Sequence, residues 1–192
     1  MKLSKLLKST SLAIVLLIGA NTFAQDKMMK AETKMVGGAE MYPTKDIVSN
    51  AVNSKDHTTL VAAVKAADLV ETLQGEGPFT VFAPTNMAFE KLPEGTVVTL
   101  LKPENKATLQ KVLTYHVIAG KHSAADIMKA IKMGNGKAEF TTVAGEKLTA
   151  MVTKGKVQLK DVAGTISTVT IEDVNQSNGV IHVVDTVVLP MK

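Results

Sequence analysis

The segment "GPFTVFAPTNMAFEKLP", residues 77–93, has the most specific local pattern in the chain. Its first half alternates in a way that predicts a buried strand, with Phe79, Val81 and Ala83 on one face and Thr80 and Phe82 on the other. Pro84 is expected to end the strand, and Thr85 or Asn86 to cap a helix whose core-facing residues are Ala88, Phe89 and Leu92. The segment contains no obvious catalytic group, so its specificity indicates demanding turn chemistry and packing.

The first 24 residues have the pattern of a secretory signal peptide. Lys2, Lys5 and Lys8 precede an apolar run at residues 12–20, and small residues at Thr22 and Ala24 mark a cleavage site. The apolar run is too short for a stable membrane span, although an uncleaved N-terminal anchor is the alternative. We therefore expect cleavage after Ala24 and a secreted or periplasmic location.

The remaining residues divide into two parts by composition. Residues 25–40 are polar and rich in methionine and lysine, and they close with Gly37-Gly38, which predicts a flexible extension. Residues 41–192 are expected to form one domain.

Charge and composition exclude several function classes. The chain has 22 basic residues, all lysine, and 18 acidic residues; without the three signal lysines, 19 bases face the same 18 acids. The absence of arginine removes bidentate recognition of phosphate. Lysines are spread evenly along the sequence and aromatic residues are scarce, so we expect no nucleic-acid partner and no sugar-stacking groove. The absence of cysteine excludes thiol catalysis, thiolate metal sites and disulfides.

Helical patterns concentrate early in the chain and strand patterns late. Thr44 is expected to cap a first helix, a longer helix is expected to run from Thr58 or Thr59 to Leu73, and Ser123 with Asp126 forms a predicted capping box. Strands are predicted at 114–118, 138–143, 147–153, 156–161, 165–172 and 180–189. This order favours an α+β fold with antiparallel strands.

No constellation of catalytic or metal-ligating residues is visible. The four histidines, which are His57, His116, His122 and His182, show no ligand spacing, and His182 and Asp185 point to opposite faces of a predicted strand. We interpret His182 as a core residue. There is no nucleophile elbow, and Gly134–Lys137 lacks the remainder of a phosphate loop. We expect no metal, no cofactor and no enzymatic activity.

Two segments carry a family resemblance. Residues 79–93 and 178–190, "NGVIHVVDTVVLP", resemble the two hallmark boxes of the fasciclin (FAS1) domain, and "YHVIAGKH" at 115–122 is similar to the Tyr-His segment between them. The resemblance covers residues 41–192 and is of the secreted, single-domain bacterial type. The positions that define the boxes are Thr80, Phe82, Pro84, Thr85, Asn86, Phe89, Asn178, Gly179, His182 and Asp185.

The resemblance implies short antiparallel strands in a wedge or sandwich flanked by helices, and an adhesive role without catalysis. In animal relatives, the Tyr-His segment and an Asp-Ile pair before the second box are associated with integrin recognition. These positions correspond here to Tyr115, His116, Asp173 and Val174, with valine in place of isoleucine. Structural roles are the alternative to these binding roles. Asp173 can be a loop or turn residue, and Tyr115 and His116 can be neighbours on a strand, with one facing the core and the other the surface.

The leading hypothesis is a secreted interaction module that supports cell-surface, extracellular-matrix or biofilm adhesion. Its expected partner is an extracellular or cell-surface protein or a matrix component. The alternative is an extracytoplasmic carrier or sensor that holds a small apolar ligand, such as a lipid, between helices and sheet. The sequence leaves the oligomeric state open.

Overall fold

The computed structural model describes residues 32–191. The predicted signal peptide at 1–24 and residues 25–31 of the predicted extension lie outside the described residues. The helices are α1 (Ile47–Ala51), α2 (Thr58–Ala66), α3 (Val70–Gln74), α4 (Asn86–Glu90), α5 (Thr96–Leu100), α6 (Lys106–Tyr115) and α7 (Ala124–Met133), with 3-10 turns at Lys55–His57 and Pro103–Asn105. The strands are β1 (Lys34–Val36), β2 (Ala39–Met41), β3 (Phe79–Pro84), β4 (Val117–Ala119), β5 (Lys137–Thr141), β6 (Lys147–Thr153), β7 (Lys156–Lys160), β8 (Ile166–Gln176) and β9 (Gly179–Val184).

Seven of these strands form one curved sheet in the order β4-β3-β9-β8-β7-β6-β5. β3 and β9 run parallel, with Phe79 opposite Gly179, and the other neighbours run antiparallel. A bridge between Ile118 and Thr142 joins the β4 edge to the chain just after β5, so the sheet nearly closes on itself. The α+β class is confirmed, and the parallel pair is an addition to the expected antiparallel strands.

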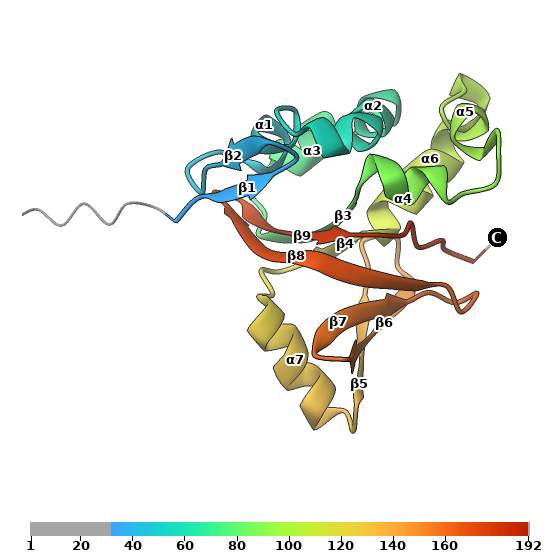
Figure 1. Cartoon of the computed structure of the whole chain (residues 1–192). Coiled ribbons are helices and arrows are strands. Elements are labelled where there is room, and N and C mark those ends of the chain that lie inside the picture. Colours follow the sequence, from blue (N-terminus) through green and yellow to red (C-terminus); the bar gives the residue numbers. More distant parts are fainter. Residues whose placement is uncertain (1–31, 192) are drawn as a thin grey trace, which may run out of the picture. The chain divides into compact units, whose positions relative to one another are not determined.

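Two hydrophobic cores lie on opposite sides of β3 and β9. Helices α1–α6 cover one side, while α7 and strands β5–β7 enclose the other (Figure 1). Val81 and Ala83 belong to the first core, whereas Phe82 belongs to the second. The alternation predicted for residues 79–83 is therefore confirmed, and the central strands are buried on both faces.

Side-chain caps begin several of the helices. The Thr85 hydroxyl accepts a hydrogen bond from the Ala88 amide at 3.2 Å, as expected for this cap. The predicted capping box before α7 is also confirmed, since Ser123 and Asp126 each accept from the other's backbone amide. The prediction for α1 is wrong: Asp46, two residues after Thr44, accepts from the Ser49 amide at 2.8 Å.

Part of the predicted flexible extension is folded. Residues 34–41 form the β1–β2 hairpin, and Val36 and Met41 are both buried in the first core. Gly37 and Gly38 both have positive φ and form the two-residue turn. The domain therefore begins before residue 41, because this hairpin contributes to its core.

The predicted long helix from Thr58 to Leu73 is two helices. The chain turns at Asp68, whose φ of 54° is left-handed and tolerated by aspartate, and α3 then resumes the apolar pattern. The predicted strand at 114–118 is also wrong in its first half. Thr114 and Tyr115 complete the last turn of α6, and His116 is its C-cap. At the end of the chain the predicted strand at 180–189 stops at Val184.

Candidate functional site

Tyr115, which the resemblance associates with binding, is fully buried in the second core. Its hydroxyl donates to the carbonyl oxygen of Lys147 at 2.9 Å, which ties the end of α6 to β6. Burial is the main cause that raises the Tyr115 pKa to about 12, so the phenol stays protonated. The side chain acts as a cross-link inside the domain and presents no surface to a partner.

His116 is also buried, so the expectation that one of the two neighbours faces the surface is wrong. Its Nδ1 lies 2.8 Å from the Val112 carbonyl oxygen, and its Nε2 accepts from the Val188 amide at 3.2 Å. These partners require a neutral ring with the proton on Nδ1. Burial lowers the His116 pKa to about 4, which is consistent with that state.

Asp173 and Val174 lie within β8, at a break in its register with β9. Val174 is buried, whereas Asp173 is partly exposed and has a φ of 54°. The Asp173 carboxylate accepts from the amide of Ala124, the first residue of α7, at 2.8 Å. Asp173 is thus at a strand irregularity, not in a loop. The binding role that the resemblance gives to these positions stays a prediction, and Asp173 is the member with an accessible side chain.

His182 is a buried core residue, as interpreted from its strand pattern. Its ring stacks on Phe82 with centroids 5.6 Å apart. Its Nδ1 accepts from the Asp173 amide at 3.2 Å, and its Nε2 lies 2.9 Å from the His122 carbonyl oxygen. Burial lowers the His182 pKa, which favours the neutral ring. Asp185 lies elsewhere, with its carboxylate accepting from the Thr168 amide at 2.8 Å.

The polar residues of the first box hold neighbouring segments together. The Thr80 hydroxyl donates to the Gly120 carbonyl oxygen at 2.7 Å and accepts from the His122 amide at 2.9 Å. Asn86, at the start of α4, accepts from the Thr59 amide at 3.0 Å and so satisfies the start of α2. Phe89 is buried in the first core, and Pro84 is buried at the end of β3. Each of these side chains has a structural task.

No metal centre emerges from the described residues. Within residues 32–191 no group of three or more histidine, cysteine, aspartate or glutamate side chains could hold a metal ion. Nor has any helix in this part the length and apolar composition that a membrane crossing requires.

The buried boxes agree with a comparison against protein-family models, in which the fasciclin domain matches residues 55–190. The chain belongs to the fasciclin domain family. The match begins after the β1–β2 hairpin and α1, so in this fasciclin domain these elements precede the matched region while packing into the same core.

Relatives of this fasciclin domain are found in bacteria and animals. Protein sll1483 of Synechocystis sp. is 48% identical over 174 residues, which are 90% of this chain and 89% of that protein. The immunogenic protein MPB70 of Mycobacterium bovis is 36% identical over 146 residues, 73% of this chain and 66% of that protein. Human periostin is 31% identical over 135 residues, but these are only 15% of periostin.

A solved structure supports the fold. The FAS1 domain pair of the insect cell adhesion molecule fasciclin I has a TM-score of 0.67 and 17% sequence identity, covering 77% of this chain and 52% of that one. At this identity the likeness establishes the fold alone.

One apolar cavity lies inside the domain, and a larger groove lies at its surface. The apolar cavity between the helical layer and β3 has a volume of about 50 Å³, smaller than the roughly 150 Å³ of a cavity that holds benzene. A larger open groove of about 860 Å³ lies between α5, α6 and the C-terminal segment. The apolar pocket expected between helices and sheet is therefore small, whereas the larger hollow is at the surface.

Proposed function

We propose that this fasciclin domain is an exported, non-catalytic interaction module that supports adhesion at the cell surface or in the surrounding matrix. The observation that carries the proposal is the family match over residues 55–190. It is supported by the fasciclin I structure, whose protein is a cell adhesion molecule, and by a cell surface glycolipoprotein of Mycobacterium bovis that is 34% identical over 149 residues.

The internal position of the box residues supports the same proposal. Because Phe82, Phe89 and His182 are buried, they maintain the scaffold, and partners would meet the exposed side chains of other positions. A scaffold of this kind needs no reactive groups in order to bind.

An attachment assay tests the proposal. A strain of the source organism without this gene should attach less to a matrix-coated surface, and the wild-type gene should restore attachment. Crosslinking in the native cell envelope should capture a surface or matrix partner. Unchanged attachment together with no captured partner would contradict the proposal.

A second candidate function is the binding of a small apolar ligand in the open groove. Its volume of about 860 Å³ is in the range of ligand sites, and its walls include Leu100, Val112 and Leu189. Native mass spectrometry of protein purified from its own cells should then detect a bound ligand. The ligand should be lost in Ala107→Trp, which fills the groove, and kept in Ala125→Trp on α7, outside it. Ligand-free wild-type protein would exclude this function.

A further inference from the structure

Lysines are denser in residues 121–166 than in the rest of the described chain, so their spread along the sequence is not even. Residues 121–166, which contain α7 and β5–β7, have eight lysines and four acidic residues, a net charge of +4 with neutral histidine. The other described residues have eight lysines and thirteen acidic residues, a net charge of −5. Charge is therefore separated between this segment and the rest of the domain, a difference already present in the sequence that the fold places in α7 and β5–β7.

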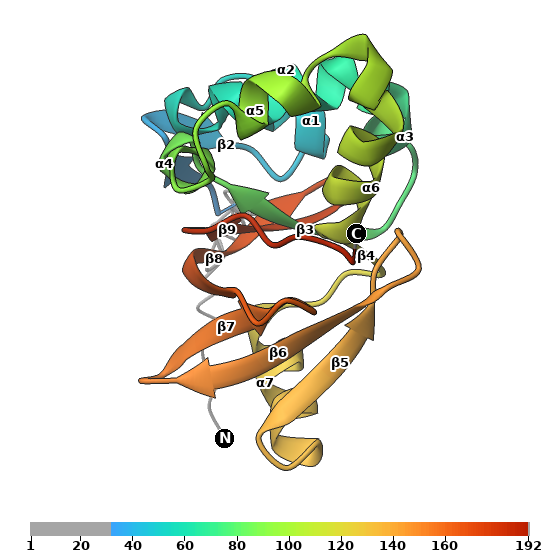
Figure 2. The same ribbon diagram turned by 90° about the vertical axis from the view of Figure 1, so that its right-hand side faces the viewer.

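Because side chains alternate along each strand, several of these lysines lie on a single face of the sheet. Leu148, Ala150, Val157 and Leu159 point inward to the second core with α7. The residues between them point outward, because successive side chains alternate across a strand. In Figure 2, β5, β6 and β7 lie in front of α7, so their outward side is turned toward the viewer. We call the four exposed lysines there the basic face: Lys137, Lys147, Lys156 and Lys160.

Most of the charge on the basic face is not neutralised. Glu139 on β5 pairs with Lys147 at 2.9 Å. Lys137, Lys156 and Lys160 form no salt bridge with any carboxylate of the described residues. Of the eight described lysines outside residues 121–166, Lys91, Lys106 and Lys111 are each paired with a carboxylate.

The side chains between these lysines indicate the chemistry of a partner. Thr149 and Met151 on β6 lie on the same face as Lys147, and Gln158 on β7 lies on that face between Lys156 and Lys160. Hydroxyl and amide groups of this kind exchange hydrogen bonds with sugar hydroxyls. Phe140, the aromatic residue of β5, packs against the second core, so the face has no platform for nucleic-acid bases.

We propose that the basic face binds a linear polysaccharide that carries carboxylate or sulfate groups. Lysines are point charges that do not require the planar geometry of an arginine site, and such a polymer presents repeated charges along a line. Lys156 and Lys160 are separated by about 13 Å along β7, at roughly 3.3 Å per residue, so one polymer chain can reach both. This inference rests on the proposed adhesive function and names its partner chemistry.

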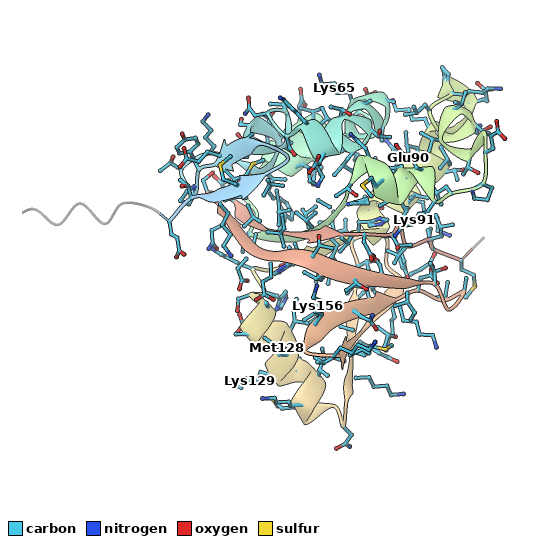
Figure 3. The ribbon with its side chains drawn as sticks, in the orientation of Figure 1. Lys65, Glu90, Lys91, Met128, Lys129 and Lys156 are labelled. Carbon is cyan, nitrogen blue, oxygen red and sulfur yellow. The ribbon has the colours of Figure 1, made fainter. Side chains whose placement is uncertain are left out.

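Binding of the full secreted protein to immobilised polygalacturonate and to heparin, each over a salt series, tests the inference. We expect binding at low salt that weakens steadily as salt increases, because exposed charge contacts are screened. Lys156→Glu/Lys160→Glu should weaken it by at least about tenfold, since two attractions become repulsions. The matched control is Lys65→Glu/Lys102→Glu in the helical layer, which should bind within about twofold of wild type. Lys65 is far from the basic face, since Figure 3 shows Lys65 and Lys156 on opposite sides of β8 and β9.

Several outcomes would overturn the inference. These are no binding to either polymer at low salt, an equal loss in the control variant, and tighter binding to duplex DNA or to anionic phospholipid vesicles. Circular dichroism must show both double variants folded, and Lys156→Gln/Lys160→Gln provides a milder version of the same test. No polymer binding together with an attachment defect in the strain that lacks the gene would leave the proposed function standing, whereas polysaccharide binding without an attachment defect would contradict the proposed function alone.

Discussion

The side-chain nitrogen of Asn178 donates a hydrogen bond of 2.8 Å to the carbonyl oxygen of Leu73, across 105 residues of sequence. The same nitrogen donates to the Gly75 carbonyl oxygen at 2.8 Å, and the Asn178 side-chain oxygen accepts from the Ile47 amide at 3.0 Å. One buried amide therefore joins the start of α1 and the end of α3 to the start of β9. The structural role of this amide explains why the second box begins with asparagine.

Replacement of this amide should be costly. Asn178→Ala leaves the Ile47 amide and two carbonyl groups without their partner, so we expect the free energy of unfolding to fall by about 2–4 kcal/mol. Urea denaturation measures this change. Asn53→Ala is the control, because Asn53 is exposed and makes a single bond to the Ser49 carbonyl oxygen, and it should cost less than about 0.5 kcal/mol. Equal midpoints for Asn178→Ala and wild type would refute the bridging role.

Gly179 should not tolerate a side chain. A Cβ atom at this position would lie 2.1 Å from the carbonyl oxygen of Phe79, its partner in the parallel β3–β9 pair. We expect Gly179→Ala to separate the central strands and to yield little folded protein, as judged by near-ultraviolet circular dichroism. Gly155→Ala has open space around it and a φ of 76°, so only backbone strain of about 1 kcal/mol should result. Similar losses in both variants would argue against the close approach.

Local chemistry made some elements predictable from the sequence. The strand at 79–84 and its Thr85 cap follow from alternation and from a side chain that can accept an amide hydrogen bond. The capping box of Ser123 and Asp126 is similarly local. The β1–β2 hairpin also had a usable signal, because Gly37-Gly38 is typical of a two-residue hairpin turn, although the polar composition of the segment favoured a linker.

Other features depend on contacts that no local window contains. Tyr115 has the residue type of a strand, yet α6 continues through it because its ring fills the second core and its hydroxyl reaches Lys147. The basic face likewise depends on register: Lys160 lies opposite Thr149, and Lys137 opposite Met151. The alternation of Lys156, Gln158 and Lys160 was a partial signal, but only the assembled sheet brings lysines of three strands together.

Buried neutral histidines should make the domain sensitive to mild acid. Burial lowers the His116 pKa from 6.5 to about 4, and it also lowers the pKa of His57 and His182. Between the two values the unfolded chain binds a proton that the folded domain does not, so stability is lost as pH falls through this range. His116 alone can contribute a loss of about 3 kcal/mol by pH 4.

Urea denaturation between pH 7 and pH 5 checks this dependence. The Asp46 carboxylate, whose pKa is lowered, contributes its loss below this window, since its ordinary pKa is 3.8. The variant His116→Gln cannot titrate, so its free energy of unfolding should depend less on pH, while His57 and His182 leave a remaining slope. An unchanged slope in His116→Gln would show that this ring is not held neutral.

Asp173 allows a structural role to be separated from a binding role. Asparagine tolerates the φ of 54° and keeps an oxygen that can accept from the Ala124 amide, so Asp173→Asn should change the free energy of unfolding by less than about 0.5 kcal/mol. Asp173→Ala loses both features and should cost about 1–2 kcal/mol. Both values come from urea denaturation, and both variants can be tested for attachment.

If the carboxylate only supports α7, attachment should decrease only as far as the free energy of unfolding decreases, and Asp173→Asn should attach like wild type. A stable Asp173→Asn protein that no longer supports attachment would instead show that the charge of Asp173 contacts the partner directly.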